Sequence, residues 1–279
     1  MRVAFLGQAG SNSEEAAIEY YGTPIEAVHC DSFTMICDAL AHGDADEAML
    51  PIENSVAGSI HSNYDILLRY DFQIVGEFVF RVRNNLLALP GVALGDVKRV
   101  LSHPQPLAQC SDYLSRLGVA LEVTSDTTVA ARRVRAELLT DTAAIASRRA
   151  AVVYDLAVLA ADIEDDAENY TRFIVLSREA RPAEADQTLK TSIVFAVAHQ
   201  PGALTKALAA FSDRGLNLMK IESRPLRGRP WEYLFYLDFV GQENSDEALR
   251  VLGEQTTMLR VLGRYPSYED SRIDGPKSA

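Results

Sequence analysis

Short apolar runs alternate with helical segments along the first 178 residues, and this alternation limits the folds open to the chain. The run Val3–Leu6 is followed by a polar turn and by a helix expected from about Glu14 to before Gly22. Further strands are expected at 48–50, 72–82, 86–89, 100–101, 143–146 and 173–176, and further helices at about 32–42, 64–68, 108–117, 129–138 and 148–159. Strands that alternate with helices in this way predict an α/β fold with a parallel sheet.

Polar residues gather at the ends of the expected strands. The five clusters are Ser11–Ser13, Glu53–Ser55, Ser102–Gln109, Ser125–Thr128 and Asn169–Phe173. In open α/β sheets, ligands lie beyond the carboxyl ends of the strands, where helix N-termini offer free N–H groups to anions. Hydroxyl, amide and carboxyl groups in this place predict a site for a polar, anionic small molecule. The clusters contain no nucleophile, base and orienting group in an evident triad, so composition alone does not reveal a reaction.

The pattern changes in the last third of the chain. Residues 179–190 have lost apolar periodicity and are expected to form a linker between a first region, 1–178, and a compact unit over 191–268. This unit has strands expected at 191–198, 216–222, 231–240 and 258–262, helices that begin near 201 and 245, and a basic turn at 224–229. The βαββαβ order predicts a ferredoxin-like sandwich. The polar tail 269–279 is expected to be disordered.

Charge and composition exclude several kinds of function. The chain has 279 residues and a formal net charge of −12, so a non-specific nucleic-acid surface is not expected. No apolar run approaches the roughly 18 residues of a membrane span, and the N-terminus lacks a signal-peptide pattern, so we expect no membrane association and a cytoplasmic location. Three cysteines without a C-x-x-C pair and five scattered histidines predict neither disulfides nor a metal site. The cysteines, Cys30, Cys37 and Cys110, are expected to be reduced core thiols.

The motifs taken together resemble the prephenate dehydratase family over nearly the whole chain. The matching segments are Gly7–Ala17, the PIENS run at Pro51–Ser55, the SHPQPLAQC run at Ser102–Cys110, Asp126–Ala131 and the TRF triplet Thr171–Phe173. The C-terminal unit resembles the family's ACT regulatory domain, with motif matches at Gly202–Leu204 and Glu222–Pro225. The resemblance implies a catalytic region of two lobes, like a type II periplasmic binding protein, with crossing strands near 73–80 and 169–176.

The activity implied by this resemblance is the decarboxylating dehydration of prephenate to phenylpyruvate, carbon dioxide and water in phenylalanine biosynthesis. Loss of carbon dioxide and hydroxide makes the substrate's ring aromatic, so the driving force resides in the substrate. The enzyme needs to bind the carboxylates and to place a donor at the departing hydroxyl. We therefore expect no cofactor: no metal, nicotinamide or covalent nucleophile is required.

By the same resemblance, Thr171 is the catalytic residue, hydrogen-bonding the departing hydroxyl. A threonine hydroxyl is a poor acid, which favours a strong hydrogen bond over full proton transfer. Arg172 either binds a substrate carboxylate or pairs with Glu168 or Asp166, and Phe173 shapes the cleft. The other substrate-binding residues implied are Glu53, Asn54, Ser55, Ser102, Gln109 and Asp126.

Structural alternatives remain open for three of these residues: Asn54 and Gln109 as amides that satisfy backbone groups, and Asp126 as a helix N-cap. The chain also departs from the family at one point. Ser11-Asn12 stands where the family has Thr-Phe. The hydroxyl is retained, but an amide replaces the aromatic neighbour, so the way this loop borders the substrate is open.

The resemblance also implies regulation by phenylalanine through paired ACT domains, and hence a homodimer or homotetramer. The expected allosteric residues are Gly202, Ala203, Leu204, Asn217, Leu218, Glu222 and Ser223. Near Gly202, backbone N–H groups would meet the amino acid's carboxylate, while Asn217 and Glu222 would meet its ammonium group. A ligand that favours one state of the enzyme shifts its activity, and feedback inhibition is expected.

Two other functions stay open from the sequence. A dehydratase that prefers arogenate, which has an amino group where prephenate has a keto group, uses similar motifs. A non-catalytic amino-acid sensor is also possible, although the presence of Thr171 argues against it. We expect no chorismate mutase activity.

Overall fold

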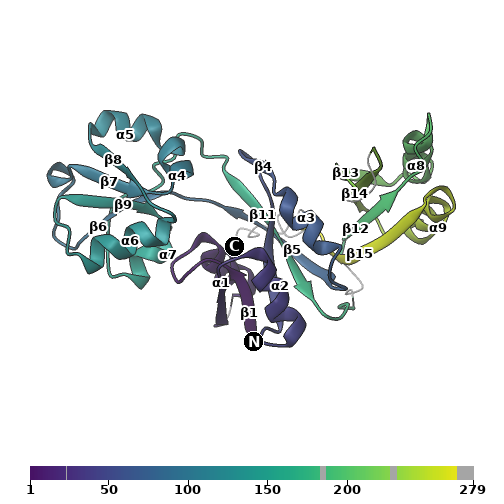
Figure 1. The fold of residues 1–279 in the computed structure, drawn as a ribbon, viewed down its shortest axis with the longest axis horizontal. Coiled ribbons are helices and arrows are strands. Elements are labelled where there is room, and N and C mark those ends of the chain that lie inside the picture. Colours follow the sequence, from purple (N-terminus) through teal and green to yellow (C-terminus); the bar gives the residue numbers. More distant parts are fainter. Residues whose placement is uncertain (23, 183–186, 227–230, 269–279) are drawn as a thin grey trace, which may run out of the picture. The chain divides into compact units, whose positions relative to one another are not determined.

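The computed structural model describes residues 1–22, 24–182, 187–226 and 231–268. The chain folds into two compact units (Figure 1), one formed by residues 1–59 and 79–173 and the other by residues 60–78 and the chain from 174 onward. The expected tail 269–279, part of the linker (183–186) and part of the basic turn (227–229) lie outside the described residues. The predicted boundaries at 178 and 191 remain predictions.

The first sheet has the strand order β2-β1-β3-β11-β5, with the short β4 beside β3. Its strands are β1 (Arg2–Leu6), β2 (Glu26–Cys30), β3 (Glu47–Asn54), β4 (Gly58–Ser59), β5 (Gln73–Arg81) and β11 (Tyr170–Ser177). The helices α1 (Asn12–Tyr21) and α2 (Phe33–His42) belong to the same lobe. Strands β1, β2 and β3 pair in parallel, as the strand–helix alternation predicts.

The second sheet, in the same compact unit, has the order β10-β6-β9-β7-β8. It contains β6 (Asn85–Ala88), β7 (Arg99–Ser102), β8 (Ala120–Val123), β9 (Thr142–Ala146) and β10 (Ala157–Ala160), with the helices η1 (Leu94–Asp96), α4 (Pro104–Gln109), α5 (Ser111–Leu117), α6 (Thr127–Ala136) and α7 (Arg148–Val153). Strand β6 runs antiparallel to both β9 and β10, so this sheet is mixed rather than wholly parallel. The chain leaves the first sheet through residues 82–84 and returns through 161–169, which confirms the expected two-lobed architecture.

Side-chain caps fix where the helices of both lobes begin. Ser11, Ser32, Asp126 and Ser147 each accept a hydrogen bond from a backbone N–H group in the first turn of α1, α2, α6 and α7 respectively. Such caps satisfy donors that have no partner within the helix. The polar clusters predicted at strand ends are therefore, in part, helix starts.

The second unit holds the βαββαβ fold predicted for the C-terminal region. Its elements are β12 (Leu189–Ala196), α8 (Ala203–Ser212), β13 (Asn217–Pro225), β14 (Tyr233–Val240), α9 (Ser245–Gln255) and β15 (Met258–Pro266), and the antiparallel sheet has the order β13-β14-β12-β15. Both helices pack on one face, where Ile193, Phe195, Phe211 and Phe239 form the core. This order confirms the ferredoxin-like prediction.

The other face of this sheet carries polar and aromatic contacts to α3 (His61–Leu67) and to the first part of β5. The Lys190 ammonium lies 2.6 Å from the Glu77 carboxylate, and the Tyr236 hydroxyl donates to the Tyr64 carbonyl at 2.8 Å. A Cβ added to Gly263 would lie 2.1 Å from the Ile74 carbonyl oxygen. The segment 60–78 is therefore packed with the chain from 174 onward as one unit.

Several predicted boundaries were wrong, and strands β2 and β8 were not predicted. Strand β3 continues through Asn54, so Pro51–Asn54 is strand rather than loop. Helix α4 begins at Pro104, because proline is tolerated in the first turn of a helix, where the N–H group has no partner within the helix. Helix α7 ends at Val153, and the remainder of its predicted range overlaps β10.

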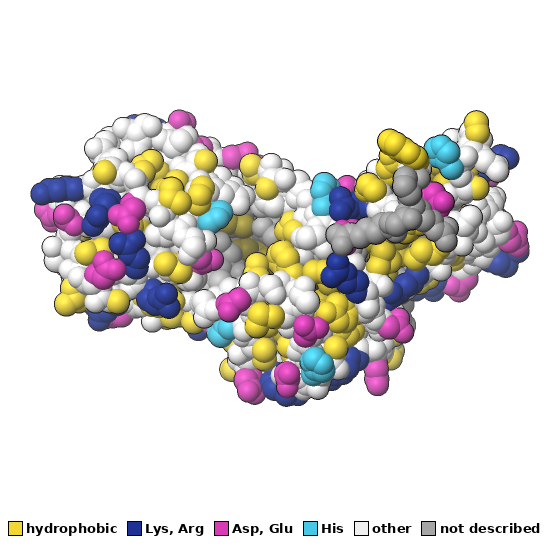
Figure 2. Space-filling model, viewed as in Figure 1, with side chains coloured by type: hydrophobic (Ala, Val, Ile, Leu, Met, Phe, Trp, Pro, Cys, Tyr) yellow, Lys and Arg dark blue, Asp and Glu magenta, His cyan; other side chains and the backbone are white. Residues whose placement is uncertain are grey.

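Several observations bear on the exclusions made from composition. The three cysteine thiols are free and buried, and burial raises the pKa of Cys37 and of Cys110 to about 12. Among the described residues, no helix is long and apolar enough to cross a membrane. On the face drawn in Figure 2, Lys and Arg side chains are scattered among Asp and Glu.

Candidate active site

Asn54, at the end of β3, is the centre of a polar network that includes Thr171. Its Oδ1 accepts hydrogen bonds from the backbone N–H groups of Val56 (3.1 Å) and Ala57 (2.9 Å), which fixes the amide's orientation. Its Nδ2 therefore faces the start of β11, where it donates to Thr171 Oγ1 at 3.1 Å and to the Tyr170 carbonyl at 3.1 Å. Since Thr171 Oγ1 accepts this bond, its own proton remains available for donation to another group.

Ser55 fastens the same turn to the start of β11. Its hydroxyl donates to the Glu168 carbonyl at 2.6 Å and accepts from the Tyr170 N–H at 2.9 Å, while its own N–H donates to the Tyr170 carbonyl at 2.8 Å. These contacts fix the backbone on either side of Asn169, so Ser55 orients the strand that carries Thr171.

Gln109 brings the second lobe into this network from the C-terminal end of α4. Its Oε1 accepts from Asn169 Nδ2 at 3.3 Å and from Asn84 Nδ2 at 3.4 Å. Asn169 Oδ1 accepts in turn from Asn54 Nδ2 at 2.9 Å. Asn54 thus does more than satisfy backbone groups, and the Gln109 amide bonds two other side chains, those of Asn84 and Asn169.

A cavity of about 500 Å³ adjoins these amides. It is lined by Val56, Ala57, Gln105, Ala108, Gln109, Asp165, Asp166 and Asn169, and so by residues of both lobes. The described lining includes two carboxylates and no Lys or Arg. A volume of this size accommodates a small organic molecule.

The remaining residues of the predicted TRF and PIENS motifs lie next to this network in sequence. Thr171 and Arg172 are half-buried on β11, and so is Glu53 on β3. Phe173 is 3% exposed and belongs to the core. The predicted substrate contacts of these residues remain predictions.

Ser102 and Asp126 have structural hydrogen bonds in the second lobe. Ser102 is fully buried, and its hydroxyl donates to the Ile145 carbonyl at 2.8 Å, joining β7 to β9. The Asp126 carboxylate caps α6, accepting from the N–H and the hydroxyl of Thr128 at 2.6 Å each. Neither residue lines the cavity described above. Asp126 is therefore the N-cap of α6, and its predicted substrate contact remains a prediction.

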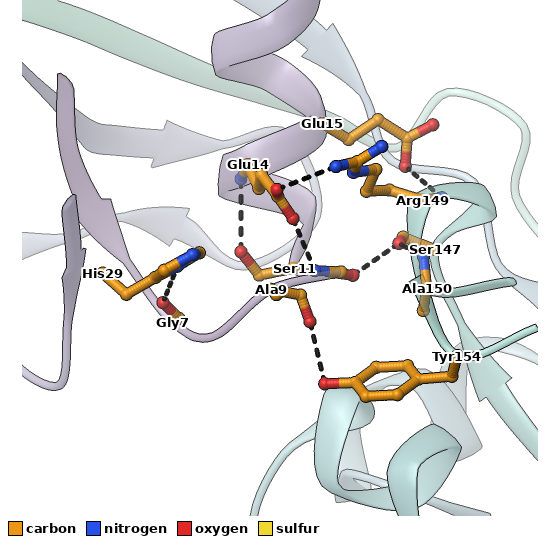
Figure 3. A network of polar contacts seen from close by, with 11 residues as sticks. Gly7, Ala9, Ser11, Glu14, Glu15, His29, Ser147, Arg149, Ala150 and Tyr154 are labelled. Carbon is orange, nitrogen blue, oxygen red and sulfur yellow. Dashed lines mark hydrogen bonds and ion pairs between the residues drawn. The ribbon is translucent and has the colours of Figure 1, made fainter. Parts of the chain in front are cut away.

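The loop that carries Ser11 and Asn12 packs directly against the second lobe (Figure 3). Ser147 Oγ donates to the Gly10 carbonyl at 2.6 Å, and the Tyr154 hydroxyl donates to the Ala9 carbonyl at 2.9 Å. The Glu14 carboxylate accepts from the Gly10 N–H at 2.5 Å and from Arg149 Nη2 at 3.2 Å. The loop is thus held to both lobes at once.

A second, more polar cavity of about 270 Å³ has three arginines in its lining. Its lining residues are Glu15, Glu19, Phe80, Arg81, Arg83, Asn85, Arg148 and Asp162. Arg81 pairs with Glu164 at 3.4 Å and Arg83 with Asp162 at 3.7 Å, so both arginines already have acidic partners. Burial raises the pKa of Glu15.

The predicted allosteric residues lie on two elements of the second unit. Gly202 is the N-cap of α8, and Ala203 and Leu204 open that helix. The other four residues, Asn217, Leu218, Glu222 and Ser223, lie on β13. Glu222 is 3.0 Å from His61 Nε2, and Asn217 Nδ2 lies 3.3 Å from the Met219 sulfur.

Comparison with known proteins matches both regions of the chain. The family model for prephenate dehydratase matches residues 3–181, and that for the ACT domain matches residues 191–255. The Arabidopsis thaliana protein named arogenate dehydratase/prephenate dehydratase 2, chloroplastic, is 48% identical over 278 residues, which cover 95% of this chain and 73% of that protein.

Two solved structures share the whole fold. Prephenate dehydratase from Arthrobacter aurescens, in complex with L-Phe, has a TM-score of 0.85 at 31% identity and covers 96% of this chain and 91% of its own. A structure described as GqqA, a novel type of quorum quenching acylases, has a TM-score of 0.89 at 33% identity, covering 98% and 100%.

Proposed function

Because the chain belongs to the prephenate dehydratase family, a family of hydro-lyases, we propose that it converts prephenate to phenylpyruvate, carbon dioxide and water. The observation that carries the proposal is the hydrogen bond from Asn54 Nδ2 to Thr171 Oγ1. It uses an acceptor site of the threonine hydroxyl and leaves its proton for the substrate.

The reaction requires a donor at the departing hydroxyl. When the bond between the ring and its carboxylate breaks, the electron pair enters the ring, carbon dioxide leaves, and the hydroxide departs from the opposite end of the ring. The hydroxide takes up one proton to leave as water. A donor fixed before the bond breaks stabilises the negative charge that develops on this oxygen. Thr171 supplies it as a strong hydrogen bond, since its hydroxyl is a weak acid.

Orientation of the substrate is the second requirement. We assign one carboxylate to Arg172, the only cationic residue within the TRF triplet, and the polar contacts of the cavity wall to Gln109 and its neighbour Gln105. Arg172 is half-buried one residue after Thr171 on β11. If Arg172 instead pairs with Glu168 or Asp166, the side-chain amides of Gln105 and Gln109 would have to orient the substrate.

Arogenate is the second candidate substrate, and one observation favours it. Arogenate carries an ammonium group where prephenate carries a keto group, and the described cavity lining includes the acidic residues Asp165 and Asp166 and no Lys or Arg. Relatives of this chain bear names that include arogenate dehydratase. Opposite charges attract in a partly desolvated site, so a carboxylate at the wall would favour the ammonium compound.

We further propose that phenylalanine inhibits the enzyme through the ACT domain. Gly202 is the N-cap of α8, and backbone N–H groups of the helix's first turn would receive the amino acid's carboxylate, while Asn217 and Glu222 on β13 would receive its ammonium group. The Arthrobacter aurescens structure in complex with L-Phe supports the class of ligand. Added phenylalanine that changes neither activity nor thermal stability would remove this part of the proposal.

The experiment is a turnover assay with prephenate and with arogenate, comparing the wild type with Thr171→Ala and Thr171→Ser. Removing the donor should lower kcat by about 10²–10³-fold, the loss expected for one preorganised donor. Thr171→Ser retains the hydroxyl and should retain most of the activity. Full activity in Thr171→Ala would refute the role of Thr171, and ligand binding without turnover of either substrate would favour the sensor.

A further inference from the structure

We infer that Asn169 is a positioning residue for the reaction: it holds Asn54, and through it Thr171, in register with Gln109 of the second lobe. The inference rests on the proposed function. Asn169 is 2% exposed and lies two residues before Thr171, at the end of the returning crossing. It also lines the cavity described above, but its amide oxygen and its amide nitrogen both bond other side chains, so we assign its effect on the reaction to those hydrogen bonds.

Both ends of the Asn169 amide are engaged. Its Oδ1 accepts from Asn54 Nδ2 at 2.9 Å, and its Nδ2 donates to Gln109 Oε1 at 3.3 Å. Gln109 Oε1 also accepts from Asn84 Nδ2 at 3.4 Å. The hydrogen bonds thus form one series, in which each donor meets an acceptor. Its members are Asn84, Gln109, Asn169, Asn54 and Thr171.

The orientation of each amide is determined by its neighbours. The backbone N–H groups of Val56 and Ala57 fix Asn54, and Asn54 Nδ2 requires an acceptor on Asn169. Rotating the Asn169 amide by 180° would set nitrogen against Asn54 Nδ2 and oxygen against Gln109 Oε1. Buried groups that lose their partners cost about 1–3 kcal/mol each, so the observed orientation is strongly preferred.

This arrangement controls the direction of the bond at Thr171. The Asn54 amino group has two hydrogens and three acceptors within reach: Asn169, Tyr170 and Thr171. Asn169 Oδ1 takes the hydrogen on its own side, which leaves the other directed at the start of β11. The Asn54 amino group then remains the donor to Thr171, and the threonine proton stays free for the substrate.

The series also joins the two lobes at both crossings. Asn84 belongs to the outgoing crossing, Asn169 ends the returning one, and Gln109 belongs to the second lobe. The Val82 N–H donates to the Asn169 carbonyl at 2.8 Å, so the two crossings also meet through the backbone. The lobes must therefore be in register for Asn169 to hold Asn54 as observed.

The test is the pH dependence of kcat in Asn169→Asp. The ionised carboxylate still accepts from Asn54, but its second oxygen faces the acceptor Gln109 Oε1. The protonated carboxyl donates to Gln109 and restores the series. We expect kcat to be reduced about 10²-fold at neutral pH, as for an ångström-scale misplacement, and to recover as pH falls toward the pKa of the new carboxyl. The wild type should show no such recovery, KM should change little, and Asn169→Ala should be impaired at every pH.

Asn85→Asp is the matched control. Asn85 is equally buried and adjacent to Asn84, but its amide donates to the carbonyls of Arg83 and Ala146 and lies outside the series. This variant should melt at a lower temperature without acid recovery of kcat. Recovery of kcat at low pH in both variants would overturn the inference, and so would an unchanged kcat in Asn169→Asp. In either case, turnover by the wild-type protein would still support the proposed function. A wild type that turns over neither substrate removes both.

Discussion

Gly10 lies where the Ser11 loop packs closely against the second lobe. It adopts φ +89°, which favours glycine, and a Cβ added there would lie 2.9 Å from Ala150 Cα. No real Cβ approaches a backbone atom this closely without a shift. A methyl group at this position must therefore displace the loop or the start of α7.

Gly10→Ala should accordingly lower stability by more than the backbone strain alone. We expect a loss of about 2–4 kcal/mol, combining strain at positive φ with overpacking. The control is Gly22→Ala, at φ +60° with nothing within 4 Å of the added Cβ, which should lose only about 1 kcal/mol. Denaturant unfolding measures both, and equal losses would show that the contact with Ala150 yields freely.

At the scale of elements, the Asp126 carboxylate has two candidate roles: N-cap of α6 and substrate contact. It starts α6 and accepts two hydrogen bonds from Thr128. Its neighbour in sequence, Thr124, donates to the Asp126 carbonyl at 2.8 Å, which closes the turn before the helix. The structural role is therefore complete without a substrate.

A pair of substitutions separates the two roles of Asp126. Asp126→Ala should cost about 1 kcal/mol of unfolding free energy through loss of the cap, whereas Asp126→Asn keeps a capping oxygen and should cost little. If the residue serves only the helix, KM for the dehydratase substrate stays the same in both variants. A large rise of KM in the stable Asn variant would instead support the predicted substrate contact.

The sequence was a good guide to elements and a partial guide to the site. Apolar periodicity placed most strands and helices, and glycine marked the end of α1, where Gly22 is left-handed. It failed at Pro104, where proline usually signals a loop, and at β10, a short run that also fits a helix.

Tertiary structure supplied what no local pattern contains. Asn84, Gln109 and Asn169 are far apart in sequence, and only the two crossings bring their amides together. Asn84 was overlooked because it follows a strand without any motif around it. Asn169 belonged to a predicted polar cluster but was given no role, because the family motif begins at Thr171. Its position shortly after an expected crossing strand is the sequence signal that could have identified Asn84.

At the scale of the whole molecule, the second unit depends on a buried ion pair. The Lys190 and Glu77 side chains are 8% and 0% exposed, and Glu77 also accepts from the Tyr268 N–H at 3.0 Å. The pair connects β12 with β5, which are far apart in sequence. A buried charge that loses its partner has no water to replace it.

Lys190→Met should therefore destabilise the protein by about 3–5 kcal/mol, because it removes the ammonium partner of the buried Glu77 carboxylate. The double variant Lys190→Met with Glu77→Gln removes both charges and should recover much of the loss. Thermal or denaturant unfolding of the three proteins forms the comparison. A double variant no more stable than the single one would show that the side chains contribute through packing rather than charge.

The hydrogen bond from Val82 to the Asn169 carbonyl has a consequence for how the lobes move. This amide lies where the chain leaves the first sheet, and its acceptor lies where the chain returns. Its hydrogen can exchange with deuterium from the solvent only while the two crossings are apart. The hydrogen-exchange rate of the Val82 amide therefore measures how often the two crossings separate, and a ligand that holds the lobes together should slow this exchange.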